Sequence, residues 1–217
     1  MTAPRVGILG GTFDPIHVGH LEAASAAKRT LSLDRVLLLP SRTPPHRSAE
    51  PRASIFHRFA MAALAAADCG MIVSDLEVRR DGPSYTALTL EALHREGLPA
   101  QQLFFITGSD AFAEVATWYD YPRILQLANF VVISRPGAPR PADLITNPNL
   151  LIPNSQSRIP DRPAVFPVDA DTSDVSSTEI RRRAGAGESI DGLVPSSVAG
   201  HIRRHNLYMP AAVAAVL

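Results

Sequence analysis

The chain has 217 residues, of which 46% are apolar and 19% charged, so it can bury a sizeable core and is not a mainly disordered protein. Lysine and arginine together number 21, as do aspartate and glutamate, and the resulting net charge of zero argues against a protein that coats nucleic acid. A protein with this net charge can still bind a small anionic ligand through a few well-placed donors.

The same composition limits the kind of site and the location. The single cysteine, Cys69, excludes an internal disulfide framework and a thiolate-rich zinc site. The first residues lack the long apolar stretch of a signal peptide, and no apolar run is long enough to span a bilayer. We therefore expect a soluble, cytoplasmic protein with no membrane or nucleic-acid partner, and the sequence leaves a homo-oligomer open.

Short apolar runs alternate with helical patterns along the chain. Strands are predicted at residues 5–10, 35–40, 71–77, 103–108 and 130–134, with a sixth at 164–168 that its internal proline weakens. Helices are predicted between them from three apolar faces: Leu21, Ala24, Ala27 and Leu31; Ile55, Phe59, Ala62 and Ala66; and Ala87, Leu90 and Leu93. This alternation predicts an α/β fold, with a Rossmann-like, doubly wound and mainly parallel sheet.

The last third of the chain differs in pattern. Residues 136–163 are rich in Pro, Asn, Arg and Ser, and we interpret them as a long surface connection. Helices are predicted after it, near residues 178–183 and at 195–205. We expect a single domain over residues 1–217, with residues 176–208 as its C-terminal helical part.

The first predicted strand runs into the string GGTFDPIHVGH at residues 10–20. Open α/β sheets bind ligands beyond the carboxyl ends of their strands, and paired glycines let the backbone approach a ligand closely. His17 and His20 project from about the same face of the next helical turn, whose free N–H groups attract anions. Two simpler interpretations are a tight turn with surface histidines and a zinc site, although Asp14 is the only acid nearby.

A second candidate phosphate site lies at the start of the helix predicted near residues 178–183. Ser176 and Glu179 have the spacing of a capping box, which explains both residues without a ligand. Alternatively, the N–H groups of the helix and the hydroxyls of Ser177 and Thr178 hold part of a polyphosphate, and Arg181 adds a charged contact.

Both strings resemble signatures of the nucleotidylyltransferases that share the H-x-G-H element with class I aminoacyl-tRNA synthetases, and within them those of bacterial nicotinate-nucleotide adenylyltransferases. The second family signature is ISSTxIR, in which Val175 replaces the first residue. The resemblance implies that His17 and His20 contact the ATP phosphates and stabilise the transition state, and that Arg181 contacts the leaving pyrophosphate. It also places four residues of the first string along the nucleotide: Gly10, Gly11, Thr12 and Phe13.

Further motifs follow in the family's order and extend the resemblance over residues 6–208: PPHR, SYTxxTL, a G-x-D element, a lone tryptophan and a closing LVPxxVxxxI. They imply further binding residues, which are Gly108, Asp110, Ser177 and Thr178 for ATP, and His46, Arg47, Tyr85, Thr86 and Trp118 for the acceptor nucleotide. Arg58 and Met61 also match the family pattern.

Several of these positions also have a purely structural interpretation. The proline-rich loop at 40–47 can be a rigid surface loop, and Ser84 and Asp110 can cap helices. Met61 is explained by core packing, and a lone tryptophan such as Trp118 is usually buried.

The resemblance implies transfer of the adenylyl group of ATP to nicotinate mononucleotide, giving nicotinic acid adenine dinucleotide and pyrophosphate. Mg²⁺ is expected to enter with ATP, and no metal site of the protein's own is visible. The alternatives are another phosphorylated acceptor, such as phosphopantetheine or a CTP-dependent acceptor, and a nucleotide-binding regulator without catalysis. One departure is His201, where the family commonly has tyrosine, and we expect it to affect packing only.

Overall fold

The computed structural model describes residues 3–45, 50–134, 137–145 and 163–210. Within these ranges, no helix is long and apolar enough to cross a membrane. The elements follow one another in this order: β1 (Val6–Gly11), α1 (Val18–Thr30), β2 (Arg35–Pro40), α2 (Ile55–Cys69), β3 (Ile72–Val73), α3 (Thr86–Arg95), η1 (Ala100–Gln102), β4 (Leu103–Gly108), α4 (Ser109–Ala113), η2 (Val115–Thr117), η3 (Arg123–Gln126), β5 (Asn129–Ile133), α5 (Pro141–Ile145), β6 (Val165–Val168), α6 (Ser177–Gly185) and α7 (Ser196–Arg204).

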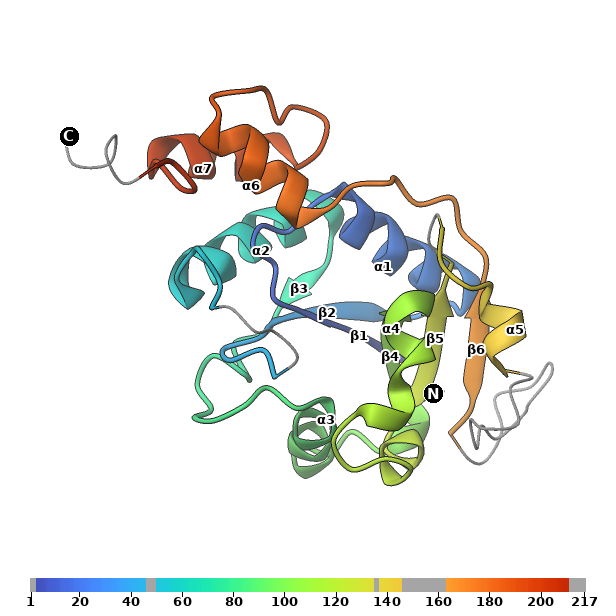
Figure 1. Ribbon diagram of the computed structural model, residues 1–217. Helices are drawn as coiled ribbons and strands as arrows, with labels where there is room; N and C mark the ends of the chain where they lie inside the picture. Colours follow the sequence, from blue (N-terminus) through green and yellow to red (C-terminus); the bar gives the residue numbers. More distant parts are fainter. Residues whose placement is uncertain (1–2, 46–49, 135–136, 146–162, 211–217) are drawn as a thin grey trace.

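The strands form one parallel sheet in the spatial order β3-β2-β1-β4-β5-β6 (Figure 1). The chain builds outward from β1 to β3, then returns to place β4 on the other side of β1, where Leu103 pairs with Val6. The direction of growth therefore reverses between β1 and β4, and doubly wound sheets bind ligands at such a switch point. The predicted fold class is confirmed.

Two hydrophobic clusters cover the two faces of the sheet. In β4, for example, Phe104 and Ile106 belong to the cluster under α1 and α2, whereas Leu103 and Phe105 belong to the cluster under α3. Figure 1 shows α1, α2, α6 and α7 on one side of the sheet and α3 on the other. Burial on both faces is why the strands read as continuous apolar runs.

Most predicted strands lie within one residue of the observed ones, but one is much shorter. The strand predicted at 71–77 is wrong beyond Val73, because after Ser74 donates its backbone N–H to Leu38 the chain turns away from the sheet. The proline-containing strand forms as β6 at the edge of the sheet, where a missing donor is tolerated. The described part of the predicted connection at 136–163 contains α5, which the composition did not indicate.

The buried face of α2 differs from the predicted one. Ile55 and Phe59 are only partly buried, and the face that packs on the sheet comprises Arg58, Met61, Ala62, Ala65 and Ala66. The prediction missed this face because a hydrophobic pattern does not place an arginine in the core.

Helix α7 packs against α2 through three histidines. His57 Nδ1 lies 3.1 Å from His201 Nε2, and the ring centroid of His205 lies 5.0 Å from that of His57 and 4.4 Å from that of His201. His201 therefore makes a polar link as well as packing. Burial, and next the charge of His205, lower the pKa of both His57 and His201.

We expect the stability of the chain to fall on acidification. In the folded chain the His57 and His201 rings resist protonation, whereas in the unfolded chain they bind protons below their ordinary pKa of about 6.5. Unfolding then takes up protons, so this contribution is complete above about pH 6.5 and is lost as the pH falls below it. Urea denaturation from pH 7.5 to 5.5 measures the loss. The loss of stability should be smaller in His201→Phe. An equal loss in that variant would show that the two histidines do not cause the pH dependence.

Candidate active site

A cavity of about 350 Å³, the size of small-molecule sites, opens beyond the carboxyl ends of β1 and β4. It brings together predicted residues from five separate segments of the sequence: Gly10, Gly11, Thr12, His20, Tyr85, Thr86, Gly108, Asp110 and Trp118. A second, narrower hollow lies next to it, and its lining includes His17, Thr172 and Ser173. His20 and Gly108 line both spaces, so the second histidine stands at their junction.

The two histidines lie ring to ring at the start of α1. Their ring centroids are 3.6 Å apart, and His17 is the N-cap residue of the helix. The backbone N–H of His17 donates to Nδ1 of His20 at 3.2 Å. Because Nδ1 accepts this bond, neutral His20 carries its proton on Nε2, which makes Nε2 a hydrogen-bond donor.

The first turn of α1 is tightly packed. The backbone N–H of Val18 donates to the Leu193 carbonyl at 3.0 Å, so this amide is not one of the free N–H groups expected to attract an anion. A Cβ on Gly19 would lie 3.2 Å from the Ser173 carbonyl and 3.3 Å from the His17 ring. Glycine at this position therefore allows the chain near Ser173 to approach the helix closely.

Phe13 lies behind the histidines. It is buried, adopts a φ of 50°, and its ring lies at 90° to that of His20 at a centroid distance of 5.1 Å. The residues that line the two spaces do not include it. Phe13 therefore supports His20 from the core side.

Asp14 joins four parts of the chain, and sequence reasoning considered it only as a metal ligand. Its carboxylate is 1% exposed and accepts hydrogen bonds from the Arg52 N–H at 2.9 Å, the Ala53 N–H at 3.1 Å and the Tyr208 hydroxyl at 3.0 Å. Arg181 Nη1 donates to the Asp14 carbonyl at 2.7 Å. Burial, and next the Asp14 carboxylate, raise the pKa of Tyr208, so this hydroxyl remains a donor. A single acid after a glycine pair gave no signal of this role.

Arg58 ties together the loops that follow β1 and β2. Its guanidinium is buried and donates to the carbonyls of Thr12 at 2.7 Å, Ser41 at 2.6 Å and Ala53 at 3.2 Å. Thr12 and Ser41 both line the cavity, so this one side chain sets the spacing of two of its walls.

Helix α6 carries the second predicted phosphate motif and docks on the first loop. Ser177 Oγ donates to the Pro15 carbonyl at 2.9 Å, and Thr178 Oγ1 accepts from Arg181 Nη2 at 3.1 Å. The lining of the cavity and the hollow does not include Ser177, Thr178 or Arg181. In the described structure these residues hold the loop that carries the histidines.

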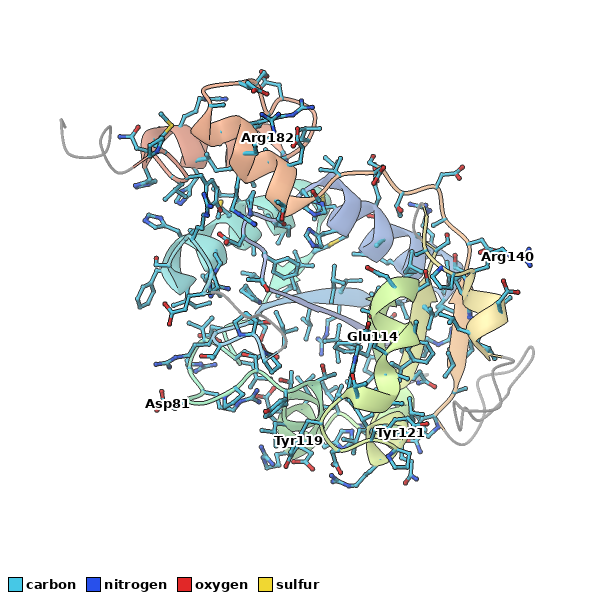
Figure 2. The ribbon with its side chains drawn as sticks, in the orientation of Figure 1. Asp81, Glu114, Tyr119, Tyr121, Arg140 and Arg182 are labelled. Atoms are coloured by element: carbon cyan, nitrogen blue, oxygen red, sulfur yellow. The ribbon has the colours of Figure 1, made fainter. Side chains whose placement is uncertain are left out.

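The capping box predicted for α6 forms only in part. Ser176 Oγ accepts the Glu179 N–H at 3.2 Å, as predicted. The Glu179 carboxylate instead accepts from Arg182 and Arg183, and these hydrogen bonds lower its pKa to about 2. Figure 2 shows Arg182 on α6, on the side away from the sheet.

Aromatic side chains form the far end of the cavity. Trp118 is partly buried, with its ring edge-on to Phe105 at a centroid distance of 6.0 Å. Tyr85 stacks on Tyr119 at 4.6 Å with an interplanar angle of 19°, and Figure 2 shows Tyr119 near α3. This end offers flat apolar surfaces to a ring-shaped ligand.

The segment before α3 is not arranged as predicted. Tyr85, rather than Ser84, is the N-cap residue, and Ser84 Oγ accepts the Thr43 N–H at 3.3 Å. Thr89 donates its hydroxyl to the buried Glu77 carboxylate at 2.6 Å, and Glu77 lines the cavity. The Ser and Thr of the SYTxxTL string thus fix the cavity wall.

His46 and Arg47, expected at the acceptor phosphate, lie outside the described residues. Among the residues that are described, no group of three or more His, Cys, Asp or Glu side chains is placed to hold a metal ion.

Comparison with known proteins identifies the family and the fold. A family model described as cytidylyltransferase-like matches residues 8–183. A "probable nicotinate-nucleotide adenylyltransferase" from Desulfatibacillum aliphaticivorans is 39% identical, covering 94% of this chain and 100% of the relative. Another protein of the same name, from Roseiflexus sp. strain RS-1, is 42% identical, and the match covers 96% of this chain and 100% of the relative. In structure, the Plasmodium falciparum nicotinic acid mononucleotide adenylyltransferase complexed with NaAD is similar with a TM-score of 0.71 at 17% identity, covering 95% of this chain and 98% of that one.

Proposed function

This chain belongs to the cytidylyltransferase-like family and, within it, to the nicotinate-nucleotide adenylyltransferases, and on this premise we propose that it transfers the adenylyl group of ATP to nicotinate mononucleotide. The products are nicotinic acid adenine dinucleotide and pyrophosphate, in the biosynthesis of NAD. The observation that carries the proposal is the position of His20 at the junction of the small-molecule cavity and the second hollow. We assign the enzyme to the cytoplasm.

The roles proposed at the phosphates follow from charge. The acceptor phosphate is already an anionic nucleophile, so the site needs alignment and neutralisation of charge rather than a strong base. His20 Nε2, with its proton fixed there by the His17 N–H, donates to an oxygen of the α-phosphate as the bond to pyrophosphate breaks. His17 lies against the same phosphates, and Arg181 neutralises the departing pyrophosphate beside the first loop. Mg²⁺ enters with ATP, bound mainly by phosphate oxygens and water.

The proposed binding contacts divide the cavity in two. ATP lies along Gly10, Gly11 and Thr12 and reaches Gly108 and Asp110, with its base toward the narrower hollow. The pyridine ring lies at the aromatic end, on Trp118 and beside Tyr85 and Thr86.

The Trp118 contact is tested by replacement. Trp118→Ala is expected to raise the KM for nicotinate mononucleotide about tenfold, because ring stacking is lost, and to leave the KM for ATP unchanged. Steady-state pyrophosphate release measures both constants. Phe56→Ala, which removes an exposed aromatic ring on α2, is the matched control. An unchanged KM for the acceptor in Trp118→Ala would remove Trp118 from the site.

A further inference from the structure

The segment that connects β6 and α6 contains no helix or strand and lies beside the site. This segment, residues 169–176, is called the strap here, and in Figure 1 it passes beside α1. Its first residues are held by Ser134, whose Oγ accepts the Ala170 N–H at 2.7 Å and donates to the Ala170 carbonyl at 2.9 Å. Its last residue, Ser176, caps α6. Both ends of the strap are therefore anchored to the fold.

The middle of the strap is held by a side chain of α1. The Glu22 carboxylate accepts two hydrogen bonds from Ser173, one from its backbone N–H at 2.6 Å and one from its hydroxyl at 2.8 Å. Each carboxylate oxygen takes one donor, so the contact fixes both the position and the rotation of this residue.

The held residue forms part of the nucleotide site. Thr172 and Ser173 line the narrower hollow together with Ile106 and Gly108. The Ser173 carbonyl also lies where a Cβ on Gly19 would come within 3.2 Å, so the strap sits directly on the turn that carries the histidines. A shift of the strap would therefore open one wall of the hollow.

We propose that Glu22 is a positioning residue for ATP: it holds the strap as the outer wall of the hollow toward which the base of ATP points. This inference rests on the proposed function for the identity of the nucleotide. Without Glu22, ATP has to order the strap when it binds, and its apparent affinity is the intrinsic affinity multiplied by the fraction of molecules in which the strap is in place. The acceptor end lies on the other side of His20 and does not depend on this contact.

The test is ATP binding measured by calorimetry in the presence of Mg²⁺, followed by steady-state kinetics. Glu22→Ala is expected to weaken ATP binding roughly fivefold to tenfold and to raise the KM for ATP equally, with the KM for nicotinate mononucleotide and the melting temperature unchanged. Ser173→Ala, which removes one of the two donors, should give a smaller effect, and the double variant should equal Glu22→Ala because both changes break one contact. Ser25→Ala, one turn further along α1, is the control.

The outcomes separate this inference from the proposed function. Wild-type affinity for ATP in Glu22→Ala would overturn the positioning role, as would a loss of affinity accompanied by an equal loss for the acceptor and a lower melting temperature. If the wild-type protein binds ATP but does not adenylylate nicotinate mononucleotide, the acceptor assignment fails while the binding series still decides the role of Glu22.

Discussion

Replacing His20 with alanine is expected to lower kcat about 10²- to 10³-fold, the usual effect of removing one donor that stabilises charge in a transition state. Among the histidines that the structure describes, only His20 lines both the cavity and the hollow, and its Nε2 proton is fixed by the bond at Nδ1. The ring is only partly buried, so we expect its removal to lower the melting temperature by only a few degrees. Single-turnover rates with saturating ATP and nicotinate mononucleotide, together with the melting temperature, measure the two effects.

The control for this substitution is His205→Ala, which removes an exposed imidazole after α7. It should keep wild-type turnover at pH 7.5. Retained turnover in a folded His20→Ala protein would contradict the catalytic role of His20. If the melting temperature instead fell so far that loss of folded protein explained the lower turnover, His20 would be a structural residue.

Replacing Asp14 with alanine is expected to lower the free energy of unfolding by about 3–5 kcal/mol, the cost of removing one partner from a buried charged network. The substitution leaves the Arg52 and Ala53 N–H groups and the Tyr208 hydroxyl without their acceptor. It also loosens the loop that carries the histidines, so kcat should fall as well. Urea denaturation at pH 7.5 gives the change in stability.

Asp75→Ala provides the comparison for Asp14. Asp75 pairs with Arg79 on the surface, where the Arg79 side chain is 73% and the Asp75 side chain 45% exposed, and such pairs contribute about 0.2–1 kcal/mol. Equal effects of the two substitutions would show that the Asp14 network does not stabilise the fold.

The fold was predictable because its signals are local. Strands such as residues 35–40 and 103–108 are buried on both faces, so they stand out as apolar runs whose ends match β2 and β4. Failures arose where tertiary contacts decide the structure. The apolar run at 71–77 leaves the sheet after Val73 at the sheet edge, and the buried Arg58 shifts the inward face of α2.

The site was predictable only in part, for the same reason. Glycines and histidines in one string reveal a ligand loop, and the sheet topology brings that loop to Gly108 and Trp118. The contacts that hold the loop join residues far apart in sequence. Tyr208 reaches Asp14 across 194 positions and Ser173 reaches Glu22 across 151, and no spacing rule connects such pairs.

The most direct test of the central claim is identification of the product. The protein is incubated with ATP, Mg²⁺ and either nicotinate mononucleotide or nicotinamide mononucleotide, and dinucleotide and pyrophosphate are quantified by chromatography with mass detection. We expect nicotinic acid adenine dinucleotide and pyrophosphate in equal amounts, formed faster than the product from the amide. Pyrophosphate release that needs phosphopantetheine or a CTP-dependent acceptor instead, or no release with any acceptor, would contradict the account.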